Sequence, residues 1–268
     1  MINEILRPVI SYIPELNRFE RIWKLAQVDF KKRYYNDRLG LFWALLDPIL
    51  QVSIYYIAFT FLMNRSREGI DNFALFLFSG LIFWKFFAET LNKSIHGMDS
   101  KKYLLKSIQF NKVDIFYSIG ISNTLGLLFN ILAYLIIATL FGVQFSVTLI
   151  FIPILIFTIL GLGLGLGMII CVIRIYVQDV KHIVNIILLL AFWTSGVFFP
   201  AQRVKDFWEP LFYINPFLGI LDNTRNILVF DRALDTKILF VNFTFSFIIF
   251  LMGKHFINNY SHKYLEKL

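Results

Sequence analysis

Residues 33–62 read RYYNDRLGLFWALLDPILQVSIYYIAFTFL and carry the strongest structural signal in the chain. The first part is basic and ends at Gly40, an aromatic step follows at Phe42-Trp43, and Asp47-Pro48 stands at the start of a long apolar run. Lys and Arg gather on the cytoplasmic flank of membrane spans, and Trp settles at the level of the headgroups. The stretch therefore predicts a membrane span whose basic flank lies in the cytoplasm.

The composition extends this prediction to the whole chain of 268 residues, of which 57% are hydrophobic. Crossing the hydrocarbon layer takes about 20 mostly apolar residues, and several segments reach that length, whereas the alternating segments of roughly ten residues that mark a membrane barrel are missing. We predict an all-α integral membrane protein, a single transmembrane domain over 1–268. Its six transmembrane helices are expected near 42–63, 72–92, 113–141, 147–173, 183–199 and 237–257.

The distribution of Lys and Arg predicts the orientation. The segments before the first span, between the second and third, between the fourth and fifth, and after the sixth hold 18 of these residues, against 7 on the other side. Because this excess marks the cytoplasmic side, both termini are expected there. The net charge of +8 is read as topogenic charge that also attracts anionic lipid, rather than as a sign of nucleic acid.

Residues 15–35 predict an amphipathic helix that lies in the cytoplasmic interface. Pro14 suits a first turn, and a face rich in Lys and Arg opposite Trp and Phe is typical of interfacial helices. The alternative is a soluble helix packed on a domain, but no soluble domain remains for it to join. The apolar positions at helical spacing are Leu16, Phe19, Ile22, Trp23, Ala26 and Phe30.

Three charges fall inside the apolar runs, namely Asp47, Lys85 and Glu89. Lys85 and Glu89 are four residues apart on one helix face, so a pair that neutralises itself is the preferred interpretation. A second hypothesis is that Asp47 meets Lys85 on the antiparallel second span. The role of Asp47 stays open between a paired structural charge and a part of an entrance.

The sequence contains no recognisable catalytic or nucleotide-binding motif. Its four histidines lack metal-ligand spacing, the lone Cys171 excludes an internal disulfide, and no phosphate-binding loop is present. Work that needs ATP would require another polypeptide. Residues 161–167 alternate Gly with Leu, which favours close helix packing within the chain over a subunit interface.

The segment 200–236 is too long and too apolar for a plain loop, and Pro200, Pro210 and Pro216 punctuate it. We expect short re-entrant helices here, in the outer loop before the sixth span. The aromatic residues at 207–208 and 211–213 suggest one that dips into the outer leaflet. Irregular backbone at that depth must be buried in protein or line a wet cavity.

Taken together, the chain resembles the permease subunits of type-2 ABC exporters, most closely the branch that exports capsule, O-antigen or teichoic acid. The likeness covers nearly the whole length and rests on the basic helix before Arg33-Tyr34, on the run LGLFWALLDP at 39–48, on RIYVQDVK at 174–181, and on SGVFFP at 195–200 followed by Asn215-Pro216. The acidic Asp47 leans toward the capsule branch. Gln178 departs from the pattern, in which Arg is common at this position.

The resemblance implies a homodimer in the bacterial cytoplasmic membrane that exports a lipid-linked polysaccharide, with two ATP-binding-cassette subunits on the cytoplasmic face. This chain would bind no cofactor, and ATP-Mg would sit on the partner subunits. Coupling to them is expected through residues 93–112, the N-terminal interfacial helix and the turn at 179. The candidate residues are Ser94, His96, Asp99, Lys101, Lys102 and Asp179. The expected entrance for a phosphate-bearing head comprises Lys32, Arg33, Arg38 and Asp47.

The same resemblance places a conduit between the two copies, lined by the first and fifth spans. Sugar rings stack on aromatic faces, so an aromatic wall passes a glycan without fixing it, although packing is the simpler reading for most single positions. The candidate lining residues are Tyr55, Tyr56, Phe59, Trp84, Phe192, Trp193, Phe198 and Phe199. The alternatives are a type-2 exporter of drugs or small lipids and a membrane-embedded glycan-lipid transferase.

Overall fold

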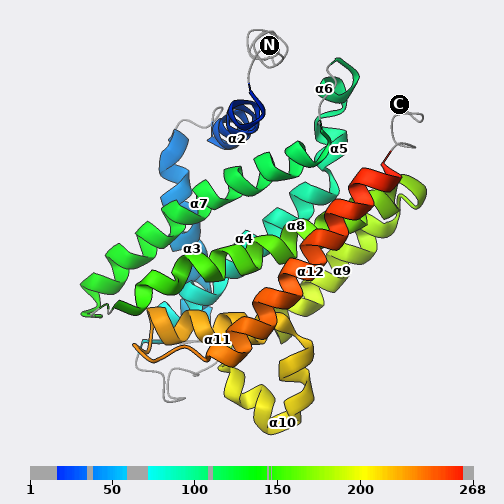
Figure 1. Ribbon diagram of the computed structural model, residues 1–268. Helices are drawn as coiled ribbons and strands as arrows, with labels where there is room; N and C mark the ends of the chain where they lie inside the picture. The colour runs from blue at the N-terminus through cyan, green and yellow to red at the C-terminus, as the bar shows by residue number, and fades with distance from the viewer. Residues whose placement is uncertain are drawn as a thin grey trace.

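The computed structural model describes residues 17–34, 39–58, 72–107, 111–143, 145 and 147–261, and all regular elements in these ranges are helices (Figure 1). Four helical stretches are long and apolar enough to cross a membrane. They are α4 (Phe73–Ile95), α7 (Val113–Leu140), Val147–Tyr176, which joins η5 (Val147–Phe151) to α8 (Ile152–Tyr176), and α12 (Thr236–Tyr260). These four helical stretches confirm the prediction of an all-α membrane protein.

The first and fifth predicted spans correspond to the shorter helices α3 (Trp43–Ile57) and α9 (Val180–Thr194), each of 15 residues. At 1.5 Å per residue such a helix covers about 22 Å, less than the hydrocarbon thickness. The prediction of α3 over 42–63 runs beyond the described residues at its end. The fifth span was predicted over 183–199, but α9 ends at Thr194. Gly196, with φ +76°, follows soon after the helix end.

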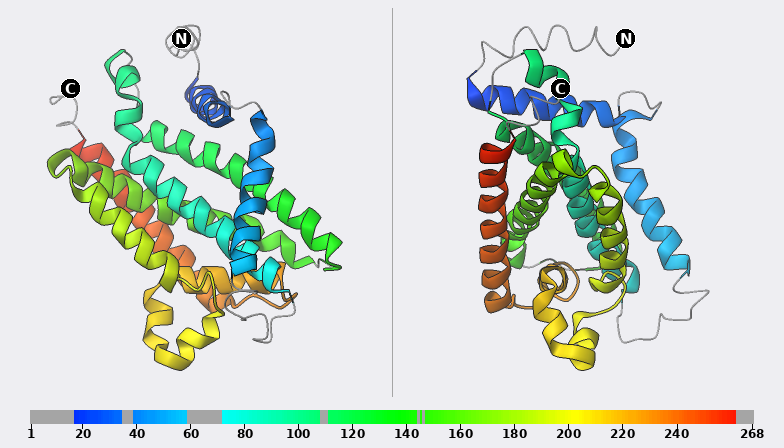
Figure 2. Two further views of the ribbon diagram at one scale, coloured as in Figure 1. Left: turned by 180° about the vertical axis from the view of Figure 1, so that it is seen from behind. Right: turned by 90° about the vertical axis from the view of Figure 1, so that its right-hand side faces the viewer.

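The alternating glycines of α8 let it pack closely on both neighbours. A Cβ on Gly165 would lie 2.7 Å from the backbone of Ile249 in α12, and one on Gly167 would lie 2.3 Å from Cβ of Ser94 in α4. Small residues permit such backbone approach. The prediction of packing within one chain is confirmed. Helix α8 lies between α4 and α12, and α3 and α12 stand on opposite sides of the bundle (Figure 2).

One end of the bundle carries α2 (Arg18–Tyr34), α5 (Gly97–Ser100), α6 (Lys102–Ser107), the turn between α8 and α9, and the last turn of α12 (Figures 1 and 2). The short η2 (Gly40–Phe42) precedes α3. The opposite end carries α10 (Ala201–Ile214) and α11 (Pro216–Leu228). The segments predicted to be cytoplasmic thus share one end of the molecule.

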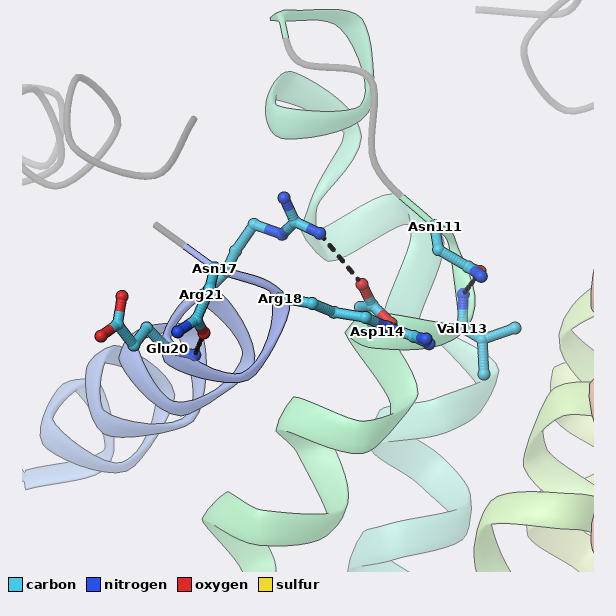
Figure 3. A network of polar contacts seen from close by, with 7 residues as sticks. All are labelled: Asn17, Arg18, Glu20, Arg21, Asn111, Val113 and Asp114. Atoms are coloured by element: carbon cyan, nitrogen blue, oxygen red, sulfur yellow. Dashed lines mark hydrogen bonds and ion pairs between the residues drawn. The ribbon is translucent and has the colours of Figure 1, made fainter. Parts of the chain in front are cut away.

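Helix α2 lies across the spans, and two arginines fasten it to the start of α7. Arg18 donates to Asp114 Oδ1 from Nε at 3.0 Å and from Nη2 at 2.8 Å, and Arg21 Nη2 lies 3.4 Å from Asp114 Oδ2 (Figure 3). Asp114 is fully buried, so its charge depends on these two partners. Asn17 caps the helix by accepting from the backbone N–H of Glu20.

The apolar positions of α2 share one side of the helix but differ in burial. Ile22 and Ala26 are buried and Phe30 stacks on Phe129 of α7, whereas Phe19 and Trp23 remain exposed. The difference arises because α2 packs on α7 with only part of this side, which leaves the rest for lipid or a partner. Residues 15, 16 and 35 of the predicted helix lie outside the described residues.

The two helices at the opposite end differ in burial. In α10, the aromatic side chains of Phe207, Trp208 and Tyr213 are exposed. Helix α11 instead packs among α4, α8 and α12, and Asn215 caps it by accepting from the backbone N–H of Phe217. The reason is that α11 carries the continuous apolar face that the centre of the bundle accommodates.

Candidate functional site

A cavity of about 730 Å³ opens between α2, α3, α4 and α7, at the end of the bundle where α2 lies. Its wall combines the aromatic ring of Trp43 and the buried Pro48 with an unusual density of charge. We call it the entrance cavity. Its charged lining residues are Asp29, Lys32, Arg33, Asp47, Lys85, Glu89 and Lys93.

Glu89 is the centre of an ion-pair network on this wall. Its Oε2 lies 3.1 Å from Arg33 Nη1 and 3.6 Å from Lys93 Nζ. Both cations also donate to Asn123 Oδ1, at 2.6 and 2.7 Å, and Asn123 Nδ2 donates to Thr90 Oγ1. The network therefore ties α2 to α4 and α7 through partly exposed groups.

Asp47 lies across the cavity and pairs with Lys85, with Oδ2 3.9 Å from Nζ. The hypothesis that these two charges meet across antiparallel helices is confirmed. The preferred pairing of Lys85 with Glu89 is wrong, because in the described structure Glu89 faces Arg33 and Lys93 instead. The register of α2 explains the difference, since it brings a guanidinium to the outward side of Glu89.

The structure brings the predicted entrance residues Lys32, Arg33 and Asp47 into this one cavity, whereas Arg38 lies outside the described residues. Sequence reasoning did not assign Asp29 or Lys93 to it. The spacing of Lys93 four residues after Glu89 was an available signal, because such pairs share a helix face. No comparable signal placed Asp29 next to Lys101, with which it forms an ion pair.

Most of the predicted conduit aromatics form one packed cluster between α3, α4 and the end of α9. Phe198 is its hub, with ring centroids 5.4 Å from Tyr55, 5.0 Å from Phe192 and 4.8 Å from Trp193. Trp84 contacts Phe192 at 5.7 Å and extends the cluster toward α11. Such separations are typical of aromatic packing.

Three predicted conduit residues fall elsewhere. Tyr56 faces away from the cluster and lines a separate cavity of about 200 Å³ with Leu75 and Phe141. Phe199 is half-buried against the core, and Phe59 lies outside the described residues. Sequence reasoning missed Phe217 of α11, which contacts Trp84 at 5.0 Å, because it treated the outer segment separately.

A buried arginine holds the opposite end of the bundle together. Arg225 of α11 is 2% exposed and donates to the carbonyls of Gly196 at 2.6 Å and Val197 at 2.7 Å. Its guanidinium also stacks 3.5 Å above the ring of Phe76. The space for it comes from Gly80, where a Cβ would lie 2.7 Å from Arg225 Nη2.

The predicted coupling residues all lie at the end that carries α2, but in different environments. His96, Asp99, Lys102 and Asp179 are exposed, and Asp99 pairs with Arg174. Ser94 packs against Gly167, and Lys101 is buried beside Asp29. Although His96 is exposed overall, partial desolvation of its ring lowers its pKa, and the nearby Arg174 adds to the shift.

Apolar helices of spanning length define a multi-pass helical membrane protein with a charged cavity at one end. The chain belongs to the ABC-2 type transporter family, whose sequence profile matches residues 20–229. Membership implies a membrane component that works with ATP-binding subunits. The matched range includes the entrance cavity, the aromatic cluster and Arg225.

Individual relatives are distant in sequence but extend over most of the chain. The O-antigen export system permease protein RfbA of Myxococcus xanthus is 23% identical over 85% of this chain and 88% of the relative. A protein of the same description from Klebsiella pneumoniae is 24% identical over 93% and 95%. The polysialic acid transport protein KpsM of Escherichia coli is 24% identical over 75% and 78%.

Proposed function

We propose that this chain is the permease subunit of an ATP-driven exporter that moves a lipid-linked polysaccharide of capsule, O-antigen or teichoic-acid type out across the bacterial cytoplasmic membrane. The observation that carries the proposal is the agreement among the relatives. Five relatives are described as O-antigen export permeases or polysialic acid transport proteins, and each alignment covers at least 75% of this chain.

The proposed topology has six spans in a single domain, with α3 and α9 as the first and fifth and both termini in the cytoplasm. The clustering of α2, α5, α6 and the end of α12 at one end supports it, because α2 and α6 alone carry eight Lys and Arg residues, against five in residues 203–237 at the opposite end. Helices α10 and α11 then form the re-entrant segment at the outer leaflet.

ATP-Mg binds to two separate ATP-binding-cassette subunits in this proposal, and the permease hydrolyses nothing itself. The exposed residues His96, Asp99, Lys102 and Asp179 contact those subunits, while Ser94 and Lys101 support the coupling segment from inside. The position of α5 and α6 at the end of the bundle that carries α2 supports this assignment (Figure 1).

A second copy of the chain completes the conduit, which runs between α3 and α9 of the two copies. Support comes from the largely exposed apolar surface of α9, where Ile186, Leu190 and Trp193 are each more than half exposed. The aromatic cluster stands behind this surface as a firm wall on which sugar rings stack. The phosphate-bearing head of the cargo approaches through the entrance cavity.

The test is to purify the chain together with the ATP-binding subunit from the neighbouring genes and to reconstitute the complex in lipid nanodiscs. A lipid-linked glycan from the source organism is expected to stimulate ATP hydrolysis, and deletion of the gene is expected to remove the glycan from the cell surface. Stimulation by drugs or small lipids alone would contradict the proposal. Sugar transfer by the isolated chain would do so as well.

A further inference from the structure

A second cavity, of about 210 Å³, lies beneath α2 and adjoins the entrance cavity. Asp29, Lys32 and Lys93 line both, so the two spaces share a wall. A water molecule takes up about 30 Å³ of liquid, which means that the smaller cavity has room for a phosphate group. We call it the inner cavity. Its remaining lining residues are His96, Ser100, Ile119 and Ser122.

The inner cavity contains more hydrogen-bond donors than acceptors. Ser122 is 2% exposed, and its hydroxyl finds no hydrogen-bond partner in the described part of the chain. Leaving such a group unpaired in a folded protein is costly. The one carboxylate on this wall, Asp29, is already engaged with Lys101. A ligand that accepts hydrogen bonds from the wall would satisfy Ser122.

Two lysines approach the inner cavity from opposite helices. Lys93 of α4 donates to Asn123 at 2.7 Å and lies 3.6 Å from Glu89, which leaves part of its three-donor capacity unused. Lys32 of α2 makes no ion pair or hydrogen bond with the described residues. The Lys32 side chain is exposed overall, but partial desolvation lowers its pKa and neighbouring Lys101 adds to the shift.

We propose that the inner cavity is a phosphate site for the head of the lipid-linked cargo, with Lys32 and Lys93 on opposite sides of the phosphate and the Ser122 hydroxyl donating to it. Lys93 exchanges Glu89 for the phosphate when the site fills. The assignment of the phosphate to cargo rests on the proposed function, whereas the binding chemistry follows from the wall itself.

The position of the inner cavity gives the site a second consequence. His96 immediately precedes α5 and Ser100 is its last residue, so one side of the cavity is the support of the proposed ATPase-contacting segment. Ser100 is fixed there by donating to the carbonyl of Gly97 at 2.8 Å. A bound phosphate therefore joins α2, α4 and the base of α5, and links cargo binding to the coupling segment.

The test measures binding of farnesyl diphosphate, a soluble prenyl diphosphate, to the complete transporter in nanodiscs of neutral lipid. Lys32→Gln and Lys93→Gln are each expected to weaken binding at least tenfold, and Ser122→Ala threefold to tenfold. Lys24→Gln is the matched control, because it removes the same charge from an exposed position of α2, and it is expected to change binding less than twofold. Equal losses in Lys24→Gln would overturn the site in favour of diffuse attraction.

Two further ligands identify the source of the phosphate. Inorganic pyrophosphate and phosphatidylglycerol are each expected to compete with farnesyl diphosphate at least tenfold more weakly than unlabelled farnesyl diphosphate does. Equal competition by pyrophosphate would assign the site to free phosphate, and equal competition by phosphatidylglycerol would assign it to bulk lipid. Lys93→Arg keeps the charge and is expected to retain binding within threefold, which separates loss of the site from misfolding.

Export in cells separates this proposal from the proposed function. If the wild-type gene restores surface glycan to a deletion strain and the double variant Lys32→Gln/Lys93→Gln restores it equally well, the phosphate site is wrong and the exporter stands. If the wild-type gene restores no glycan while lysine-dependent diphosphate binding persists, the exporter assignment is wrong and the site stands.

Discussion

The two ends of the bundle hold positive charge in opposite ways. In the entrance cavity, Arg33 and Lys93 are partly exposed and share the carboxylate of Glu89 at 3.1 and 3.6 Å. At the other end Arg225 is buried, and its two terminal nitrogens donate to backbone carbonyls while its guanidinium stacks on an aromatic ring. Ion pairs at an exposed site exchange partners at little cost, while a buried guanidinium bound to backbone does not.

The ion pairs of the entrance cavity can exchange partners, whereas the hydrogen bonds of Arg225 at the other end hold the structure in place. Glu89 holds its cations with a partly exposed side chain, and in the proposed site an incoming phosphate competes with it. Arg225 fixes the turn at Gly196 and Val197, which follows α9, against α11 and α4. Substitutions at the two ends are therefore expected to differ strongly in their effect on stability.

The largest expected effect is that of Arg225→Met at the fixed end. The variant leaves the carbonyls of Gly196 and Val197 without donors, which lowers the free energy of unfolding by about 3 kcal/mol or more at ~1–3 kcal/mol for each unsatisfied group. Unfolding of the purified protein in detergent measures it. The matched control is Arg232→Met, at an exposed position. If Arg225→Met lowered the free energy of unfolding by less than about 1 kcal/mol, the two ends would not differ in stability as we expect.

Asp114→Asn tests a charge that differs from the others near the entrance cavity, because the Asp114 carboxylate is fully buried. Its charge-assisted hydrogen bonds with Arg18 weaken, and a loss of about 2–3 kcal/mol follows from the usual strength of such bonds. The same unfolding measurement checks it, with Glu20→Gln on the exposed side of α2 as the control. A similar change in both variants would show that burial of Asp114 does not matter.

Gly80→Ala tests how tightly the fixed end is packed. The new methyl group would lie 2.7 Å from Arg225 Nη2, so the guanidinium must shift, at a cost of about 1–3 kcal/mol for an overpacked interior. Gly161→Ala is the matched control, because a Cβ there first meets an atom at 3.6 Å. Equal stability of the two variants would contradict the rigid placement of Arg225.

Glu89→Gln is expected to have the smallest effect on stability. The carboxylate is partly exposed and its pairs with Arg33 and Lys93 contribute less than about 1 kcal/mol. Because Lys93 loses a competitor, farnesyl diphosphate is expected to bind more tightly, whereas Glu209→Gln on α10 leaves binding unchanged. Weaker binding by Glu89→Gln would show that Glu89 orders the site rather than competing for it.

The hydrophobic pattern predicted the helices well because length and apolar content determine what can cross a membrane. The spacing of Gly161 and Gly165 also predicted close packing, since a missing side chain has the same meaning in any fold. Pairings across helices were harder to predict. Arg33 reaches Glu89 only because α2 crosses α7 at a particular register, and no local pattern contains that register.

The outer end shows the same limit. Arg225 counted only as a loop charge in the sequence, because its burial depends on Gly80, Phe76 and the turn at Gly196 meeting in space. The aromatic positions Trp84, Phe192 and Phe198 were predicted individually, and three dimensions were needed to join them into one cluster. The sequence therefore predicted the kinds of residue at these positions, but it did not predict which residues of other helices they would contact.

The glycines of α8 have a mechanical consequence. Gly165 lies against the backbone of Ile249 and Gly167 lies against Ser94, so the contacts are too close for α8 to slide along α12 or α4. A shift by one residue would drive a leucine side chain into the notch that a glycine leaves open. We therefore expect the three helices to move together as one rigid body. A conformational change that opens the conduit would then have to occur at α3 and α9.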